Sequence, residues 1–191
     1  MSGFRWQYGP GDGRLRGMTQ MLFSETLPSP VGAITLLTDG DGVLRALEFE
    51  EHHDRMERLL RLHYPRGWQV VPASAESDAR RALAAYFAGD LSAIDALPTA
   101  TGGTDFQRAV WAALRDVPAG RTVAYADIAA TIARPTAMRA VGMANGSNPI
   151  AIVVPCHRII GRSGMLTGYA GGLARKQWLL AHEGVPTGLP L

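Results

Sequence analysis

The only cysteine of the chain, Cys156, stands in the segment Pro155-Cys156-His157-Arg158. A lone cysteine cannot form an internal disulfide or a multi-cysteine metal site, so packing, redox sensing and nucleophilic attack remain as its roles. Buried packing is the commonest fate of a free cysteine, but an adjacent histidine is the kind of base that activates a thiol. The pair therefore marks residues 155–158 as a candidate nucleophilic site.

The residues around this pair must hold both side chains toward one pocket. The apolar run over residues 150–154 predicts a β-strand that ends at Pro155, because proline removes a ladder donor and fixes φ. Consecutive side chains of a strand point to opposite faces, so Cys156 and His157 can converge only in a turn after it. Glycines within residues 168–172 predict a loop, and a final helix is expected over residues 173–182.

Two short helical segments precede the cysteine, at residues 125–131 and 137–144, with the spacing of a helix-turn-helix. Thr136 is expected to cap the second helix, and Gly146 is expected to end it in the left-handed conformation. Small residues allow this helix to pack closely, and Arg139 is its only charged side chain. Any αα-hairpin fits this spacing, so the helices alone do not establish DNA binding.

Charge and composition narrow the class of protein. The net charge is +2, but residues 1–101 carry −3 and residues 102–191 carry +5, so the half with Cys156 is basic. That asymmetry fits a polyanion-binding half, and it fits a solvated basic face about as well. With 47% hydrophobic residues, no apolar stretch near ~18 residues and no signal peptide, the sequence predicts a globular, cytoplasmic protein without a membrane partner.

The pattern divides the chain into parts. Residues 33–37 and 43–49 predict a hairpin around Asp-Gly pairs, while residues 54–62 and 77–87 predict helices and residues 68–71 a strand. His52 and His53 are interpreted as part of a solvated face. Three parts are expected: a flexible extension over residues 1–22, an α/β domain over residues 23–98 and a second domain over residues 102–186.

The second domain begins after a linker-like stretch, residues 91–103. Thr104-Asp105-Phe106-Gln107 predicts a capping box that opens a helix. One apolar face of this helix comprises Phe106, Val110, Trp111 and Leu114, and Pro118 and Gly120 end it.

Several motifs in order resemble one known family. Residues 152–160, which contain the Pro-Cys-His-Arg segment, are followed by Gly168-Tyr169-Ala170-Gly171-Gly172 and by Arg175-Lys176 and residues 179–184. This arrangement resembles the O6-alkylguanine-DNA alkyltransferases. The resemblance spans residues 28–184 and includes residues 103–107, Val110-Trp111, Tyr125, residues 139–142 and Asn148-Pro149, and more loosely residues 29–32 and 86–89.

The resemblance implies a fold and a set of roles. It implies an α+β two-domain chain, with a ribonuclease-H-like small α/β domain first and an all-α-dominated, winged-helix-like domain with a helix-turn-helix second. Cys156 would be the nucleophile, His157 its base acting through a water, and Glu183 the carboxylate that holds the histidine. The remaining implied residues are Asn148 as a brace of the turn, Tyr125 as a donor to guanine N3, Ile159, Tyr169 and Ala170 in the substrate pocket, and Thr136, Ala137, Arg139, Ala140 and Gly142 on DNA.

The implied activity is direct reversal of DNA damage. An alkyl group would pass from O6-alkylguanine, and from O4-alkylthymine, to Cys156 after the base is flipped out through the minor groove. A thioether is a poor leaving group, so each molecule would act once. No cofactor, no metal and no obligate protein partner are expected, and double-stranded DNA would be the partner of a monomer.

Other functions compete with this interpretation. A redox-sensing helix-turn-helix regulator would use Cys156 as a sensor without alkyl transfer. A cysteine hydrolase would ordinarily carry a Gly-x-Cys-x-Gly setting, which this sequence lacks. A lesion-binding relative without transfer activity would be expected to lack the cysteine, so its presence favours transfer.

Overall fold

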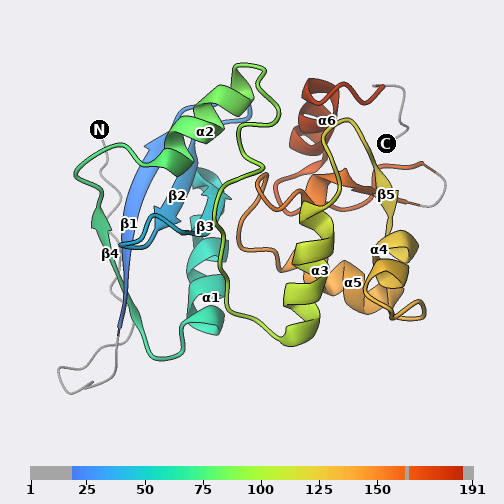
Figure 1. Ribbon diagram of the computed structural model, residues 1–191, viewed down its shortest axis with the longest axis horizontal. Helices are drawn as coiled ribbons and strands as arrows, with labels where there is room; N and C mark the ends of the chain where they lie inside the picture. Colours follow the sequence, from blue (N-terminus) through green and yellow to red (C-terminus); the bar gives the residue numbers. More distant parts are fainter. Residues whose placement is uncertain (1–18, 162–163, 187–191) are drawn as a thin grey trace.

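The computed structural model describes residues 19–161 and 164–186 (Figure 1). No helix in these ranges is long and apolar enough to cross a membrane. The elements are, in chain order, β1 (Gln20–Leu27), β2 (Ile34–Thr38), β3 (Leu44–Phe49), α1 (His53–His63), β4 (Trp68–Pro72), α2 (Asp78–Phe87), α3 (Asp105–Arg115), β5 (Val123–Ala124), α4 (Tyr125–Thr131), α5 (Met138–Gly146), β6 (Ile159–Ile160) and α6 (Leu173–His182).

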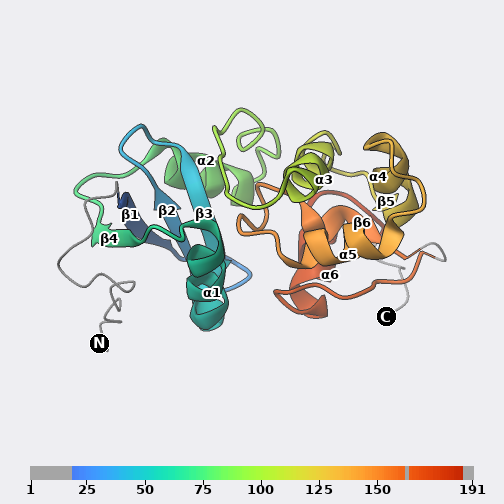
Figure 2. The same cartoon turned by 90° about the horizontal axis from the view of Figure 1, so that it is seen from below.

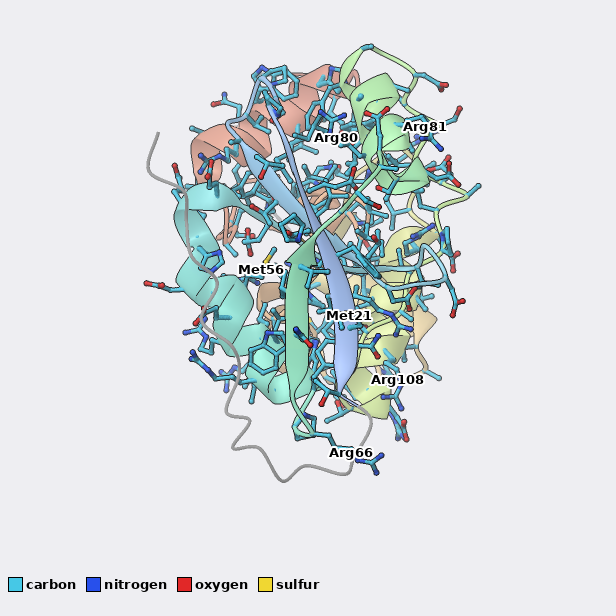
Figure 3. All side chains as sticks on the ribbon, turned by 90° about the vertical axis from the view of Figure 1, so that its left-hand side faces the viewer. Met21, Met56, Arg66, Arg80, Arg81 and Arg108 are labelled. Atoms are coloured by element: carbon cyan, nitrogen blue, oxygen red, sulfur yellow. The ribbon has the colours of Figure 1, made fainter. Side chains whose placement is uncertain are left out.

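The first half is a four-stranded mixed sheet in the order β3-β2-β1-β4. Strands β1, β2 and β3 are antiparallel neighbours, and β1 pairs in parallel with β4, which lies beside it in Figure 3. The predicted hairpin is confirmed, since the Asp39 carboxylate accepts from the amides of Asp41 and Val43 at 3.0 Å. Asp-Gly turn chemistry therefore fixes the register of β2 and β3.

Both faces of the sheet are buried. The consecutive residues Leu36 and Leu37 of β2 belong to different apolar clusters, because successive side chains of a strand face opposite sides of the sheet. Helix α1 covers the face of Leu37, with Met56 in the same cluster, and α2 covers the face of Leu36 (Figures 2 and 3).

The start of the sheet corrects one sequence expectation. Residues 1–22 were expected to form a flexible extension, but Gln20 to Leu22 belong to β1, and Leu22 is fully buried. Residues 1–18 lie outside the described residues. Polar residues alternate irregularly with apolar ones in this strand, so its periodicity is weak.

The second half consists mainly of helices (Figure 1). The expected capping box opens α3, because the Thr104 side chain accepts from the Gln107 amide and the Gln107 side chain accepts from the Thr104 amide. Helices α4 and α5 pack on each other and on α3, as the helix-turn-helix spacing predicts. A two-stranded parallel pair, β5-β6, joins the start of α4 to the residues after the cysteine.

The two halves share one core. The largest apolar cluster contains Leu36 and Leu47 of the sheet together with Ile150 and Leu179 of the second half. The expected linker is also tied down, since the Leu44 amide donates to the Pro98 carbonyl at 2.9 Å. The sheet therefore supports the second half directly.

The apolar run before the cysteine is not the predicted strand. Ile150 forms only an isolated bridge to Leu47, and residues 151–154 form a turn. Ile152 is fully buried and has φ 68°, a strained value for a β-branched residue. Buried turns and buried strands are equally apolar, so periodicity cannot separate them over five residues.

The expected ends of the second helix are also wrong. The N-cap of α5 is Ala137, with no side-chain cap, and Thr136 is exposed outside the helix. Gly146 lies inside α5, and the following Ser147 has φ −98°. Ser147 donates its hydroxyl to the Ala144 carbonyl at 3.1 Å, which satisfies a C-terminal carbonyl without a left-handed glycine.

Candidate active site

Cys156 begins a single 3-10 turn, Cys156–Arg158, directly after Pro155. The thiol is buried, at 5% exposure, and Sγ accepts a hydrogen bond from Asn148 Nδ2 at 3.0 Å. The same amide nitrogen donates to the Val154 carbonyl at 2.8 Å, and Asn148 Oδ1 accepts from the Ile150 amide at 3.0 Å. Asn148 thus fixes the buried turn and the thiol together.

Two opposing effects act on the thiol. Burial raises the pKa of Cys156, because a thiolate is poorly solvated there, while the Asn148 hydrogen bond and the charge of Arg55 lower it. A thiol in this setting stays protonated at neutral pH until a base removes the proton. The site therefore needs a base as well as a nucleophile.

His157 and Glu183 form a buried pair. His157 Nε2 lies 2.9 Å from Glu183 Oε1, and both side chains are fully buried. Burial lowers the pKa of His157 despite the carboxylate, so the ring is neutral at pH 7. A carboxylate only accepts, so the proton of the neutral ring sits on Nε2 and Nδ1 carries the lone pair. Nδ1 has no partner among the described residues and is the ring nitrogen free to accept a proton.

Glu183 has further partners that the sequence did not suggest. Arg158 donates to both carboxylate oxygens at 2.9 Å, and the Tyr86 hydroxyl donates to Oε1 at 2.8 Å. Burial alone would raise the pKa of Glu183, but the hydrogen bonds from His157 and Arg158 and the positive charge of Arg158 hold it far below its usual range. Glu183 is thus a buried carboxylate anion. Arg158 and Tyr86 lie within the quoted motifs, but only the fold shows where they meet.

Lys176 is a second buried cation, after Arg158, whose role the sequence does not indicate. It is fully buried in α6, and Nζ donates to the carbonyls of Ile159 and Thr167. Burial lowers the pKa of Lys176 to about 8. The ammonium group therefore ties α6 to the two segments that follow the cysteine.

The expected pocket residues come from three segments. Tyr125, at the start of α4, places its hydroxyl 3.3 Å from Thr167 Oγ1. Ile159 is fully buried. Its carbonyl oxygen accepts one hydrogen bond from Lys176 and has a second lone pair that can accept another. The Tyr169 hydroxyl is buried without a partner among the described residues, while Ala170 is exposed.

The glycine-rich loop, residues 168–172, packs against Phe49 of the sheet half. A Cβ at Gly171 would lie 2.3 Å from the Phe49 ring, so only glycine fits this close approach. The Tyr169 ring packs edge-on against both Phe49 and His157, with ring centroids 6.4 Å apart in each pair. The backbone of the loop therefore approaches Phe49 closely at Gly171.

A groove of about 270 Å³ runs between the start of α4 and α5, and its lining residues are Ala124, Tyr125, Ala126, Met138, Arg139 and Gly142. A Cβ at Gly142 would lie 3.7 Å from the Tyr125 ring, which is an ordinary van der Waals contact, so the groove has room for a small side chain at this position. Arg139 and Ala140 are exposed, and Ala137 is half-buried. Met138 and Met143 are also exposed on α5, so this helix of mostly small residues carries two large apolar side chains on its surface.

The described residues contain no group of three or more His, Cys, Asp or Glu side chains placed to hold a metal ion. His52 and His53 instead lie beside Glu51 and Glu57, at 3.5 Å each, and both are half-buried.

The site thus brings together a buried thiol and a neutral histidine held by a carboxylate anion, and a helix pair with an exposed arginine lies beside them. Residues 22–101 match the ribonuclease-like domain of 6-O-methylguanine DNA methyltransferase, and residues 105–185 match its DNA binding domain. The chain belongs to this family.

Individual relatives agree along most of the chain. The methylated-DNA--protein-cysteine methyltransferase of Salmonella typhimurium is 54% identical over 164 residues, which cover 85% of this chain and 96% of the relative. The protein of that name from Mycolicibacterium paratuberculosis is 48% identical over 85% of this chain and 93% of the relative. The crystal structure of Mycobacterium tuberculosis OGT in complex with DNA matches with a TM-score of 0.69 and 43% identity, covering 87% of this chain and 96% of that one. These matches favour alkyl transfer over redox sensing.

Proposed function

We propose that the protein transfers an alkyl group, methyl above all, from O6-alkylguanine in double-stranded DNA to Sγ of its own Cys156. The observation that carries this proposal is the buried thiol held by Asn148 beside the His157–Glu183 pair. The proposal deepens what the relatives' names state, because it assigns the acceptor and its base to named side chains.

The chemistry follows from the charge states of the site. His157 Nδ1 takes the thiol proton through a bridging water, and Glu183 stabilises the imidazolium that forms. The thiolate then attacks the alkyl carbon, the bond from carbon to O6 breaks, and its electron pair moves to the guanine. The guanine takes up a proton, so the net change exchanges an alkyl group for hydrogen.

The pocket residues hold the base during this step. Tyr125 donates a hydrogen bond to guanine N3 and so stabilises the charge on the departing base. The carbonyls of Cys156 and Ile159 and the amide of Ala170 bind the base edge, and Tyr169 forms a wall of the pocket. O4-alkylthymine presents a similar alkyl ether and is proposed as a second substrate.

Helix α5 is proposed to enter the minor groove, where readout is degenerate and damage in any sequence is accessible. Arg139 fills the position in the base stack that the flipped nucleotide leaves. Its exposure at the edge of the protein groove between α4 and α5 supports this role. The other proposed DNA contacts on and before this helix are Thr136, Ala137, Ala140 and Gly142.

A finer description of the fold belongs to the same proposal. Residues 23–98 are proposed as a ribonuclease-H-like scaffold and residues 102–186 as a winged-helix-like DNA-binding and acceptor domain. The protein is proposed to act in the cytoplasm as a monomer, without a cofactor and without an obligate protein partner.

Single turnover is the kinetic test of the proposal. A thioether on Cys156 has no hydrolytic exit, so lesion removal should stop at one O6-methylguanine per protein molecule. Titrating a duplex that contains the lesion with protein, and then adding fresh duplex, measures this stoichiometry. Continued repair of the second addition would contradict the proposal.

Arg139→Ala is expected to slow repair of duplex DNA by about 10- to 100-fold, since base flipping costs a few kcal/mol and the wedge offsets part of it. Reaction with free O6-benzylguanine should change less than about twofold, because a free base needs no flipping. Arg66→Ala is the matched control, since it removes one exposed positive charge from the turn before β4 (Figure 3). Equal loss on both substrates would count against the wedge role.

A further inference from the structure

One arginine of the first half reaches across to the site. Arg55, on α1, is 13% exposed and forms an ion pair with the buried carboxylate of Glu48 on β3. Its other terminal nitrogen donates to the Gly146 carbonyl at 2.6 Å and to the Asn148 carbonyl at 3.1 Å. A single guanidinium group thus joins the sheet half to the segment that connects α5 with the cysteine.

The two carbonyls that Arg55 binds belong to residues in different structural positions. Gly146 ends α5, where unpaired carbonyls and the negative end of the helix dipole favour a cation. Asn148 is the residue whose side chain donates to Cys156 Sγ. Arg55 therefore contacts both the end of the proposed DNA-binding helix and the backbone of the residue that binds the thiol.

The neighbouring backbone contacts make this connection rigid. The Leu47 amide donates to the Pro149 carbonyl at 2.9 Å, and the Ala151 amide donates to the Leu47 carbonyl at 3.0 Å. Strand β3 thus holds residues 149–151 while Arg55 holds residues 146 and 148. Such a support works through planar fork geometry, which a lysine cannot reproduce.

We propose that Arg55 is a positioning residue for alkyl transfer: it holds Asn148, and through it Sγ of Cys156, in register with the end of α5. The first half of the chain then helps to set the reactivity of the thiol. This inference rests on the proposed function, because the reaction affected is the alkylation of Cys156.

The test separates the effect of the hydrogen bonds of Arg55 on the position of the thiol from the effect of its positive charge. Arg55→Lys keeps the charge but loses the fork, while the double variant Glu48→Gln/Arg55→Gln removes both charges and leaves no unpaired buried ion. The charged or titratable groups around the thiol are Arg55, Glu48, Lys176, His157 and Tyr169, and both variants retain the last three. Arg45→Lys is the matched control, because Arg45 pairs with Asp39 in the hairpin turn.

The measurement is the rate constant for reaction of Cys156 with free O6-benzylguanine across pH, together with the urea unfolding midpoint of each variant. Both Arg55 variants should lower the plateau rate by about tenfold or more, since small misplacements of a reacting group have effects up to about 100-fold. The apparent pKa of the pH profile should change little in Arg55→Lys, because the charge remains. The control should react at the wild-type rate.

Two failures are distinguishable. If the wild-type protein alkylates neither with O6-benzylguanine nor with lesion DNA, the proposed function itself is wrong. If the wild type reacts and both folded Arg55 variants keep plateau rates within about twofold of it, only the positioning role is overturned. The positioning role would also be overturned if a variant reacted slowly only under conditions where part of it is unfolded, and reacted at the wild-type rate where its unfolded fraction is negligible.

Discussion

Cys156→Ser is expected to abolish alkyl transfer while DNA binding and folding persist. A serine hydroxyl is a far weaker nucleophile than a thiolate, and its neutral histidine partner cannot ionise it in a buried site. The rate should fall by about 10⁵-fold or more, the order seen when an enzyme loses its nucleophile. The hydroxyl still accepts the hydrogen bond of Asn148, so the turn should keep its conformation.

Two measurements establish this result. Transfer of a radiolabelled methyl group from duplex DNA to the protein should be undetectable for Cys156→Ser, and fluorescence anisotropy should give a Kd within about threefold of wild type because α5 is unchanged. Labelled protein in the serine variant would show that another side chain accepts the methyl group.

Glu183→Gln is expected to damage both activity and stability. The carboxylate is fully buried and accepts from His157, Arg158 and Tyr86, and glutamine offers one acceptor oxygen and no charge. Arg158, only 3% exposed, would lose its counter-ion, which costs about 3–5 kcal/mol in comparable buried pairs. The amide would also cease to fix the histidine tautomer, an effect of about 10²- to 10⁴-fold on rate.

The dependence of stability on pH gives Glu183 a specific signature. Its pKa in the folded protein is far below its usual value, so it contributes stability above the unfolded pKa of about 4.3, and this contribution falls as pH drops toward the folded pKa. Urea unfolding between pH 7 and pH 3 should therefore show a steeper acid loss for wild type than for Glu183→Gln. Asp116→Asn, an exposed carboxylate after α3, serves as the control. Parallel curves for wild type and Glu183→Gln would contradict the buried anion.

Local patterns were predictable where local chemistry decides the structure. The capping box at Thr104 and the Asp-Gly hairpin after β2 depend on side chains within a few residues, and both are confirmed. The pairing of His157 with Glu183, which are 26 residues apart, is also found. The prediction of this pairing came from the ordered motifs of the family, since the spacing of residues alone does not indicate that the end of α6 lies beside the cysteine.

The errors and omissions arise from long-range contacts. The apolar residues 151–154 form a turn in which Asn148 donates to the Val154 carbonyl and the Ala151 amide donates to the Leu47 carbonyl, contacts that the sequence does not display. Arg55 and Lys176 read as ordinary cations in sequence, yet the fold places them on backbone carbonyls around the thiol. Buried cations are recognisable only after their partners are known.

The most direct test of the central claim is the position of the methyl group after reaction. Wild-type protein incubated with duplex DNA that contains O6-methylguanine should gain one methyl per molecule, and fragmentation of the proteolysed product should place it on Cys156 within the peptide spanning residues 140–158. An unchanged intact mass with saturating lesion, or a methyl group on any other residue, would contradict alkyl transfer to the buried thiol.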